Sequence, residues 1–421
     1  MKSLNSDKNW GHAVSRDLVH WQELPVALRP ERDGGMWSGS AEVDWHNVAG
    51  FQQGPEPAML VFYTATGRSA MNPKPAEPGD FVQNIAYSND RGRSWTKYAG
   101  NPILRNFTPK NRDPYVFWHE PSKKWIMLLY VGEPVSDPGN HYKTRFFSSD
   151  NLKDWAADSS VDGFFDCPVM FELPLDGNAA ETRWVIHCAD MKYKVGRFDG
   201  KTFTPETGLI DGHKAKISES AYTAQIFRNL DRARTVQMAW LYNQLPGFRQ
   251  MMTFPCKLAL VTTAEGPRLR WQPVREIEAA YGSAQTWRDV TLRPDDQTVV
   301  RARGRQLDIR TEIRVREAAE IEINVRGVPV VLHAKSKQLT VHGYALPVKL
   351  KDDVLTLRIL VDELSLELFA DDGLVYLPLS LPFSPQNEAV TLAVRGGNAL
   401  AERIDIAEIK SIWPASASAG R

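Results

Sequence analysis

Asp113 stands in a setting that suits a catalytic carboxylate. It lies in residues 111–115 (N-R-D-P-Y), directly before the apolar run 116–118. Pro114 biases the residue before it towards an extended backbone. The neighbouring Arg112 supplies a positive charge that favours the ionised carboxylate. We therefore expect Asp113 to be a charged side chain presented at the start of a strand.

Asp166 is the second candidate. It lies in residues 163–168 (G-F-F-D-C-P), close to Phe164, Phe165 and Cys167. Apolar surroundings raise the pKa of a carboxyl group, as a general acid near neutral pH requires. Two carboxyl groups, one of them acting as an acid, are the machinery of glycoside hydrolysis. Each aspartate taken alone also fits a simple turn residue.

Charge and composition exclude several other functions. The 421 residues include 51 Lys+Arg and 51 Asp+Glu, so the formal net charge is zero. Nucleic-acid and anionic-membrane partners usually leave a basic excess, so we expect neither. No apolar run approaches the roughly 18 residues of a membrane-spanning helix, so we expect no membrane insertion.

The sequence also lacks the signals of a metal or cofactor site. The three cysteines form no C-x-x-C pair, and the nine histidines show no ligand spacing. No glycine-rich phosphate loop, H-E-x-x-H or G-x-S-x-G motif occurs. We expect no metal and no cofactor. The 13 tryptophans suit both a β-rich core and the stacking of sugar rings.

Strand patterns dominate the chain. Short apolar runs bounded by Gly, Pro, Asp or Asn predict strands at residues 59–64, 125–131 and 183–187. The only helical pattern, at residues 273–280, is long enough for two turns. The predicted fold class is therefore all-β.

A repeated pattern divides the first part of the chain. Residues 15–21, 88–95 and 149–155 share it, and residues 196–203 are a fainter copy with Phe in place of Trp. In this pattern Asp or Ser closes a turn by bonding backbone amides, and a Trp then opens the next strand and buries its indole. Units of this size predict the blades of a β-propeller, although a sandwich could carry similar hairpins.

The pattern changes near residue 282. Residues 354–361 and 364–369 alternate apolar and polar side chains around an Asp-Glu turn, which predicts a hairpin, and residues 390–394 continue the alternation. We expect a β-propeller over residues 1–282, a β-sandwich over 283–413 and a disordered tail over 414–421.

These motifs resemble those of the family 32 glycoside hydrolases, which include levanases, inulinases and invertases. The resemblance covers nearly the whole chain and rests on segments in a fixed order: residues 10–21 (W-G-H-A-V-S-R-D-L-V-H-W), 24–28 (L-P-V-A-L), 37–41 (W-S-G-S-A), 112–114 (R-D-P), 166–168 (D-C-P), 222–227 (Y-T-A-Q-I-F), 251–256 (M-M-T-F-P-C) and 272–274 (Q-P-V). It implies a five-bladed β-propeller followed by a β-sandwich. Another five-bladed propeller family, which cleaves arabinans or xylans, fits W-S-G-S-A and R-D-P less well.

The resemblance also implies roles for individual residues. Asp113 would stabilise the transition state by holding hydroxyl groups of the fructosyl ring, through hydrogen bonds that strengthen as positive charge develops. Asp166 stands at the position of the general acid/base. Four further residues would bind substrate: Trp10, Trp37, Ser38 and Arg112.

Two departures from the family pattern affect catalysis. The family acid/base is Glu, so Asp166 is one methylene shorter. The family nucleophile is an aspartate in an N-D-P-N-G-type motif before the W-G-H segment, and nine residues without that motif precede Trp10. We therefore expect an N-terminally shortened chain with an incomplete first blade, and weak or undetectable hydrolysis by residues 1–421.

Three functions stay open on these grounds. The leading one is retaining hydrolysis of β-fructofuranosidic bonds in levan, inulin or sucrose. A non-catalytic fructan-binding propeller and a fructosyltransferase are the alternatives, and the motifs separate neither endo from exo action nor one oligomeric state from another. The expected partner is a carbohydrate, and a polymeric one would favour an extracellular or periplasmic location.

Overall fold

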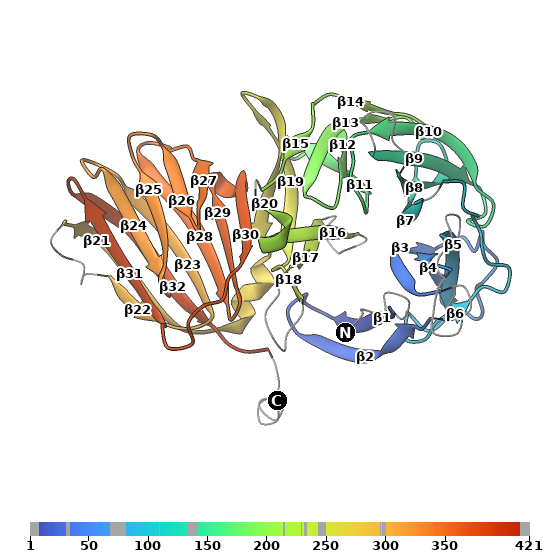
Figure 1. Cartoon of the computed structure of the whole chain (residues 1–421), viewed down its shortest axis with the longest axis horizontal. Coiled ribbons are helices and arrows are strands. Elements are labelled where there is room, and N and C mark those ends of the chain that lie inside the picture. Colours follow the sequence, from blue (N-terminus) through green and yellow to red (C-terminus); the bar gives the residue numbers. More distant parts are fainter. Residues whose placement is uncertain are drawn as a thin grey trace. The chain divides into compact units, whose positions relative to one another are not determined.

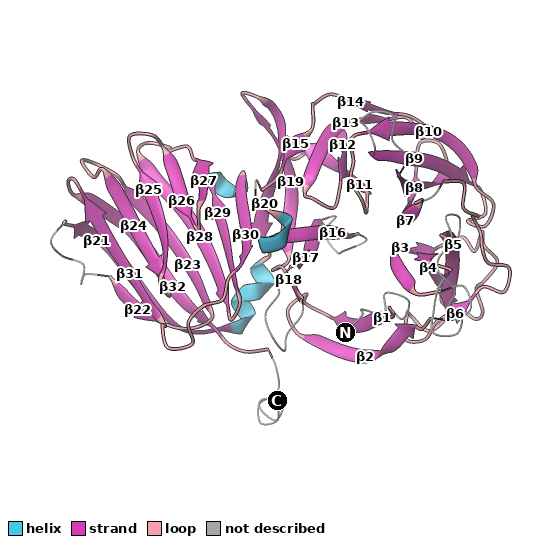
Figure 2. Ribbon diagram, in the orientation of Figure 1, coloured by secondary structure: helices cyan, strands magenta, loops and turns pink. Residues whose placement is uncertain are grey.

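Strands make up nearly all of the regular secondary structure in the described residues (Figure 1, Figure 2). The computed structural model describes residues 8–30, 34–67, 81–108, 110–132, 142–213, 215–228, 230, 234–242, 250–294, 296 and 300–412. Among these residues there are three short 3-10 helices: η2 (Ile217–Glu219), η4 (Arg275–Ala280) and η5 (Asp371–Gly373). The predicted two-turn helix is η4. No helix in the described part is both long and apolar enough to cross a bilayer.

The described residues form two compact units. The first runs to Ile210, except for Arg16–His20 and Leu175–Gly177, and the second contains these two segments and the chain from Asp211. The predicted domain boundary at residues 282 and 283 stays a prediction. The predicted tail at residues 414–421 lies outside the described residues, as does Trp413.

The first unit contains four groups of strands in chain order. The first is a sheet with two described strands, β1 (Trp10–Ser15) and β2 (Trp21–Leu28). Each of the next two is a four-stranded antiparallel meander, and the fourth group is one part of a ten-stranded sheet. Their strands are β3 (Met36–Asp44), β4 (Ala58–Ala65), β5 (Val82–Ser88) and β6 (Thr96–Lys97); β7 (Arg112–His119), β8 (Lys124–Gly132), β9 (Tyr142–Ser149) and β10 (Ala156–Asp162); and β11 (Val169–Leu175), β12 (Asn178–His187), β13 (Lys192–Phe198) and β14 (Phe203–Pro205), with β15 (Ile210–Asp211) beside β13.

The second unit begins with a fifth group of strands and continues into a sandwich. The fifth group is β16 (Ala221–Phe227), β17 (Thr235–Leu241), β18 (Met251–Met252), β19 (Cys256–Thr263) and β20 (Gly266–Pro273). Together with the four groups above, it makes the five blades of a β-propeller, with a β-sandwich after it. The predicted fold class is confirmed.

The sandwich consists of two six-stranded antiparallel sheets. In sheet order, the first is β21 (Tyr281–Leu292), β32 (Ala399–Ile409), β23 (Leu307–Arg314), β28 (Val354–Asp362), β29 (Ser365–Ala370) and β30 (Val375–Ser380). The second is β22 (Arg301–Arg303), β31 (Ala389–Arg395), β24 (Glu320–Val325), β25 (Val328–His333), β26 (Gln338–Val341) and β27 (Tyr344–Pro347). The predicted hairpin is β28 and β29. Strict alternation of buried and half-buried residues along β24 shows one face turned to an aliphatic core.

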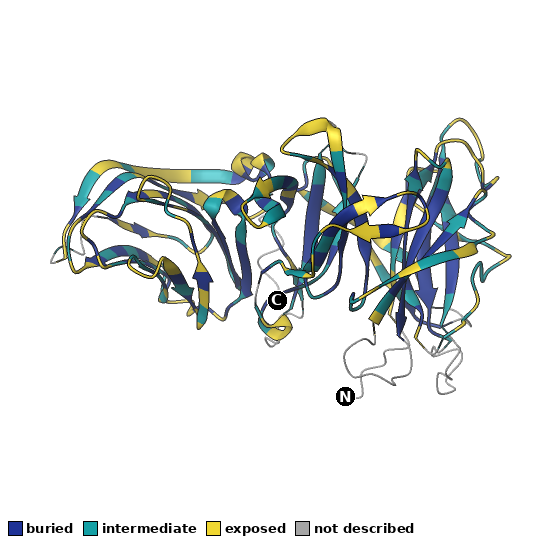
Figure 3. Cartoon of the chain, turned by 90° about the horizontal axis from the view of Figure 1, so that it is seen from above, coloured by how far each residue is buried: buried dark blue, intermediate teal, exposed yellow. Residues whose placement is uncertain are grey.

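The repeated turns form as the sequence predicts. One side-chain oxygen in each turn accepts hydrogen bonds from two backbone amides at 2.7–3.0 Å, and the four residues concerned are Asp17, Asp90, Asn151 and Asp199. The aromatic residue that follows is fully buried only as Phe203; the three tryptophans at this position are half-buried. Buried residues lie mostly on the strands and exposed ones mostly on turns (Figure 3). The turns therefore organise the blades without large aromatic burial.

A bulge interrupts the first strand of three blades. The pairing register shifts between Met36 and Gly39 in β3, and between Arg112 and Tyr115 in β7. A third shift lies between Tyr222 and Ala224 in β16. A bulge adds one unpaired residue and turns its side chain to a new direction. In β3 and β7 the interrupted stretch contains the W-S-G and R-D-P segments.

Gly39 provides a test of the β3 bulge. A Cβ on this residue would overlap the carbonyl oxygen of Phe62 on β4, so Gly39→Ala should lower the free energy of unfolding by about 1–3 kcal/mol. Gly11→Ala on β1 is the matched control, because nothing lies within 4 Å of its Cβ position. Urea unfolding of both variants measures the difference, and equal losses would contradict the close approach at Gly39.

Candidate active site

The backbone of Asp113 is held at the bulge of β7 by a buried polar chain. Its N–H donates to Thr64 Oγ1 at 2.8 Å, and the Thr64 hydroxyl donates to Gln83 Oε1, also at 2.8 Å. Gln83 Nε2 in turn donates to the carbonyl oxygen of Asn111 at 3.2 Å. All four residues are buried. Because three strands share these bonds, the position of Asp113 is tied to the packing of two sheets.

The place of Asp113 before Pro114 predicts an extended backbone, but the structure shows a different conformation. Its φ is +63°, in the left-handed region. Pro114 disfavours the right-handed helical region for the residue before it, but the bulge requires a third conformation. Aspartate tolerates the left-handed region better than most residues do. The expectation of an extended backbone is therefore wrong at this position.

Asp166 lies in a tight turn immediately before β11. Both Asp166 and Cys167 have positive φ, +57° and +37°. The N–H of Ala189 donates to the carbonyl oxygens of Phe165 (3.2 Å) and Asp166 (3.1 Å), which fixes the turn. Cys167 then points its N–H and its thiol at Asp113 Oδ2, at 3.4 and 3.3 Å. This turn brings two carboxyl groups together from positions 53 residues apart in the chain.

Arg112 joins the two carboxyl groups. Its Nε and Nη2 contact Asp166 Oδ1 at 2.9 and 2.8 Å, and Nε lies 3.4 Å from Asp113 Oδ2. The guanidinium also lies 4.4 Å from the ring centroid of Tyr130 on β8, a cation–π contact. We expected Arg112 to favour the ionised form of Asp113. The structure places its closest contacts on Asp166 instead, so the surroundings of Asp166 are not purely apolar.

Burial and like charge act together on Asp113. Its pKa is raised well above the ordinary 3.8, first by burial and then by Asp166, with which it shares a hydrogen bond. Arg112 and the Cys167 thiol oppose this shift without cancelling it. For Arg112, burial lowers the pKa, but the two carboxylates outweigh it and raise the value. Arg112 thus lowers the pKa of Asp113 as expected, but burial and Asp166 raise it by more.

Three of the predicted binding residues approach this centre to different degrees. The side chains of Ser38 and Cys167 are hydrogen-bonded, so Ser38 joins the carboxyl group cluster. Trp37 is half-buried and packs edge-on against Phe81, with a centroid separation of 5.4 Å. Trp10 Nε1 donates to the carbonyl oxygen of Trp37 at 2.9 Å. Trp10 therefore supports the backbone of Trp37.

Asp113, Asp166 and Cys167 also have the spacing of a metal site. Their candidate ligand atoms lie within 4.8 Å of one another. However, Arg112 already supplies a positive charge in contact with both carboxyl groups. The donor set is thus occupied by an ion-pair network, and it does not require a metal for charge balance.

Sequence reasoning missed two residues of this centre. Tyr130 stands inside an apolar run that reads only as a core strand, and Thr64 ends another such run. Both act through long-range contacts, on Arg112 and on the Asp113 backbone. Nothing in their local sequence marks them. Cys167, which we read only as an apolar neighbour of Asp166, contacts Asp113 directly.

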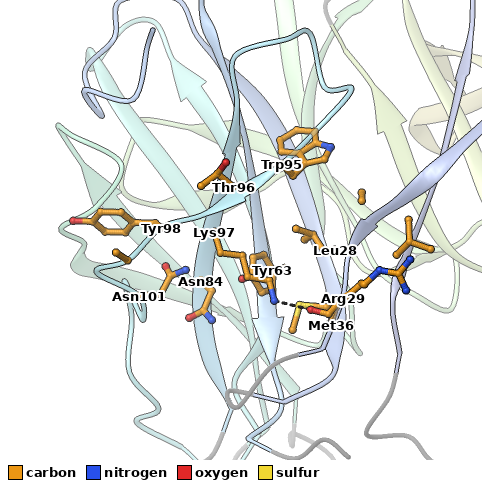
Figure 4. A pocket seen from close by; sticks show the side chains of 13 residues that line it. Leu28, Arg29, Met36, Tyr63, Asn84, Trp95, Thr96, Lys97, Tyr98 and Asn101 are labelled. Carbon is orange, nitrogen blue, oxygen red and sulfur yellow. Dashed lines mark hydrogen bonds between the residues drawn. The ribbon is translucent and has the colours of Figure 1, made fainter. Parts of the chain in front are cut away.

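A hollow of about 660 Å³ lies elsewhere in the first unit, against β2 and the sheet of β3–β6 (Figure 4). Leu28, Tyr63, Asn84 and Trp95 are among the residues that line it. Neither Asp113 nor Asp166 lines it. Because the hollow has no acidic lining residue, we place the chemistry at the Asp113–Asp166 pair.

Comparison with known proteins identifies the family. The family model described as "Glycosyl hydrolases family 32 N-terminal domain" matches residues 1–273. The chain belongs to family 32 of the glycosyl hydrolases. The predicted resemblance is confirmed. The described geometry therefore belongs to a family 32 member, and the roles of Asp113 and Asp166 stay predictions.

Named relatives span most of this family 32 chain. A levanase of Bacillus subtilis (strain 168) is 32% identical over 464 residues, covering 96% of this chain and 64% of the levanase. An extracellular exo-inulinase of Aspergillus niger is 28% identical over 482 residues, covering 96% of this chain and 87% of the inulinase. The crystal structure of exo-inulinase from Aspergillus awamori superposes with a TM-score of 0.81 at 26% identity, covering 96% and 90% of the two chains.

The raised pKa of Asp113 predicts a pH-dependent cost in stability. A carboxyl group whose pKa rises on folding destabilises the fold progressively as pH climbs from its unfolded value to its folded value. Asp113→Asn removes this ionisation. The free energy of unfolding of the variant should therefore equal that of the wild type near pH 4. Near pH 8 it should exceed the wild-type value by on the order of 2 kcal/mol.

Thermal or urea unfolding at a series of pH values measures this difference. Asp150→Asn is the control, because that exposed carboxylate pairs with Lys124 at the surface, where an ion pair contributes little to the free energy of unfolding. A flat difference for Asp113→Asn as well would show that its carboxyl group is not desolvated as described.

Proposed function

We propose that this chain is a glycoside hydrolase acting on β-fructofuranosidic bonds. One observation carries the proposal: in a family 32 chain, Arg112 holds Asp113 and Asp166 in one cluster, with candidate ligand atoms of the two aspartates within 4.8 Å of each other. The relatives named levanase, exo-inulinase and invertase support fructans or sucrose as the substrate class. The chain spans 64% of the Bacillus subtilis levanase.

The burial of the two carboxyl groups supports different roles for them. The side chain of Asp166 is 15% exposed and that of Asp113 is 4% exposed. Asp166 is thus the one that a leaving-group oxygen reaches, and we assign it proton donation to that oxygen as the glycosidic C–O bond breaks. We assign Asp113 to the fructosyl ring hydroxyls, with Ser38, Trp37 and Arg112 around the same ring. Trp10 acts on this site through Trp37.

The nucleophile is not assigned to Asp113. A retaining mechanism needs a second carboxylate about 5–5.5 Å from the acid that can reach the anomeric carbon. Asp113 is buried and its Oδ2 lies against Cys167 and Arg112. The 421 residues contain no N-D-P-N-G motif. The buried position of Asp113 favours a second candidate, a fructan-binding propeller that holds sugar without cleaving it. A fructosyltransferase would use the same residues with a sugar acceptor in place of water.

Three measurements separate these functions. Release of free fructose from levan, inulin and sucrose supports the hydrolase and ranks the substrates. Fructan binding by calorimetry without release of fructose supports the binding module. Longer oligosaccharides formed from sucrose without equivalent free fructose support the transferase. If the protein neither binds nor turns over any of the three sugars, the proposal is contradicted.

Asp166→Asn tests the assigned acid. In a chain extended at its N-terminus with the nucleophile segment of the family, removing the proton donor should lower kcat by about 10²–10⁴-fold on sucrose, whose leaving group is a poor one. With an activated aryl β-fructoside the rate of the bond-breaking step should fall much less, because the leaving group of this substrate departs with little protonation. Initial rates on both substrates measure the difference.

Glu172→Gln is the matched control for the acid. Glu172 lies three residues into β11, is exposed and accepts a hydrogen bond from the Thr182 hydroxyl. It should change neither rate by more than about twofold, the scatter expected of a surface substitution. If Asp166→Asn lowers both rates equally while Glu172→Gln shows the split, the acid is Glu172.

A further inference from the structure

Three aromatic rings surround the outer side of Asp166. Phe165 directly precedes it, and its ring packs edge-on against Tyr142, the first residue of β9, with centroids 4.9 Å apart. Tyr130 on β8 completes the group at 6.2 Å from Tyr142 and 6.3 Å from Phe165. Tyr130 is also the ring beneath Arg112. The aromatic group is therefore connected to the catalytic ion pair on two sides, through Phe165 and through Arg112.

Exposure increases from the carboxyl groups towards Tyr142. Tyr130 is 3% exposed, whereas Tyr142 is 39% exposed. Phe165 is half-buried between them. Large exposed apolar side chains are few among the described residues, so an exposed ring packed on this group is notable. Tyr142 presents the part of the group that a ligand can reach from solvent.

The neighbours of Asp166 in the chain contact different parts of the site. Cys167, on one side, contacts Asp113, to which we assign the fructosyl ring. Phe165, on the other side, contacts Tyr142. Since a general acid must lie within about 2.6–3.2 Å of the oxygen it protonates, the bond to be cleaved lies at Asp166. The departing sugar then extends towards Phe165 and Tyr142.

We propose that Tyr142, backed by Phe165, is the stacking surface for the leaving-group sugar. This inference rests on the proposed function and adds a specificity-determining residue to it. An aromatic ring offers a broad apolar face at low conformational cost, which matches the C–H face of a sugar ring. The site therefore selects β-fructosides whose leaving group is itself a sugar ring over those with a small alcohol.

The backbone at Tyr142 does not depend on its ring. The carbonyl oxygen of Tyr142 accepts a hydrogen bond from the N–H of Gly163 at 2.9 Å, and β9 pairs with β8 from this residue onwards. The ring can therefore be removed with little effect on the strand. This allows a binding effect to be measured apart from folding.

The test compares two probes that differ only in the leaving group. Free fructose occupies the fructosyl position alone, and the sulfur-linked analogue of sucrose, which resists hydrolysis, occupies both positions. Calorimetric binding of each is measured for the wild type, Tyr142→Ala and Tyr142→Phe. We expect Tyr142→Ala to weaken binding of the disaccharide analogue by about 3–10-fold and to leave the affinity for fructose unchanged. Tyr142→Phe should retain wild-type affinity, because the ring face is kept.

Trp45→Ala is the control for loss of an exposed aromatic ring. Trp45 is 63% exposed and follows the last residue of β3, whereas Trp37 stands near the start of that strand. Trp45→Ala should change the affinity for neither fructose nor the disaccharide analogue. Equal weakening of both probes by Tyr142→Ala, or no weakening of either, would overturn this inference alone. Failure of the wild type to bind fructose would instead overturn the proposed function, and this inference with it.

Discussion

The guanidinium of Arg112 lies between two carboxyl groups that would otherwise repel each other in a poorly solvated place. It contacts Asp166 at 2.8 Å and Asp113 at 3.4 Å, and it packs on the ring of Tyr130. Removing Arg112 would leave both carboxyl groups without a compensating charge, which is far more costly than losing a surface ion pair. The contacts of β7, β8 and the turn before β11 around this site are therefore organised by one cation.

This arrangement has a local cost in backbone conformation. Asp113, Asp166 and Cys167 all occupy the left-handed region, which non-glycine residues rarely adopt. Such residues cluster where a function requires an unusual side-chain direction, and the surrounding structure must hold them. At Asp113 the buried chain through Thr64 and Gln83 does this; at Asp166 the two bonds from Ala189 do it.

The blades separate stability from function. The Asp and Asn turns repeat from blade to blade, and their side chains bond backbone amides and side chains within four residues in the chain. The bulges at the first strands vary in what they present: Trp37 and Ser38 in β3, Arg112 and Asp113 in β7. The same kind of bulge therefore holds the carboxyl group of Asp113 in β7, whereas in β16 it holds Tyr222 and Thr223.

The sequence by itself determined the strands, the hairpin turns and the fold class, because alternation and turn chemistry act between residues close in the chain. It also marked Asp113, Asp166, Arg112, Trp37 and Ser38 as one set through the family motifs. Only the tertiary structure decided which carboxyl group is desolvated, that Arg112 contacts Asp166 more closely than Asp113, and that Tyr142 packs against Phe165. These outcomes depend on contacts between residues separated by tens of positions, such as the 54 between Arg112 and Asp166. Charge and solvation are set by the neighbours that folding brings together, and local sequence does not specify them.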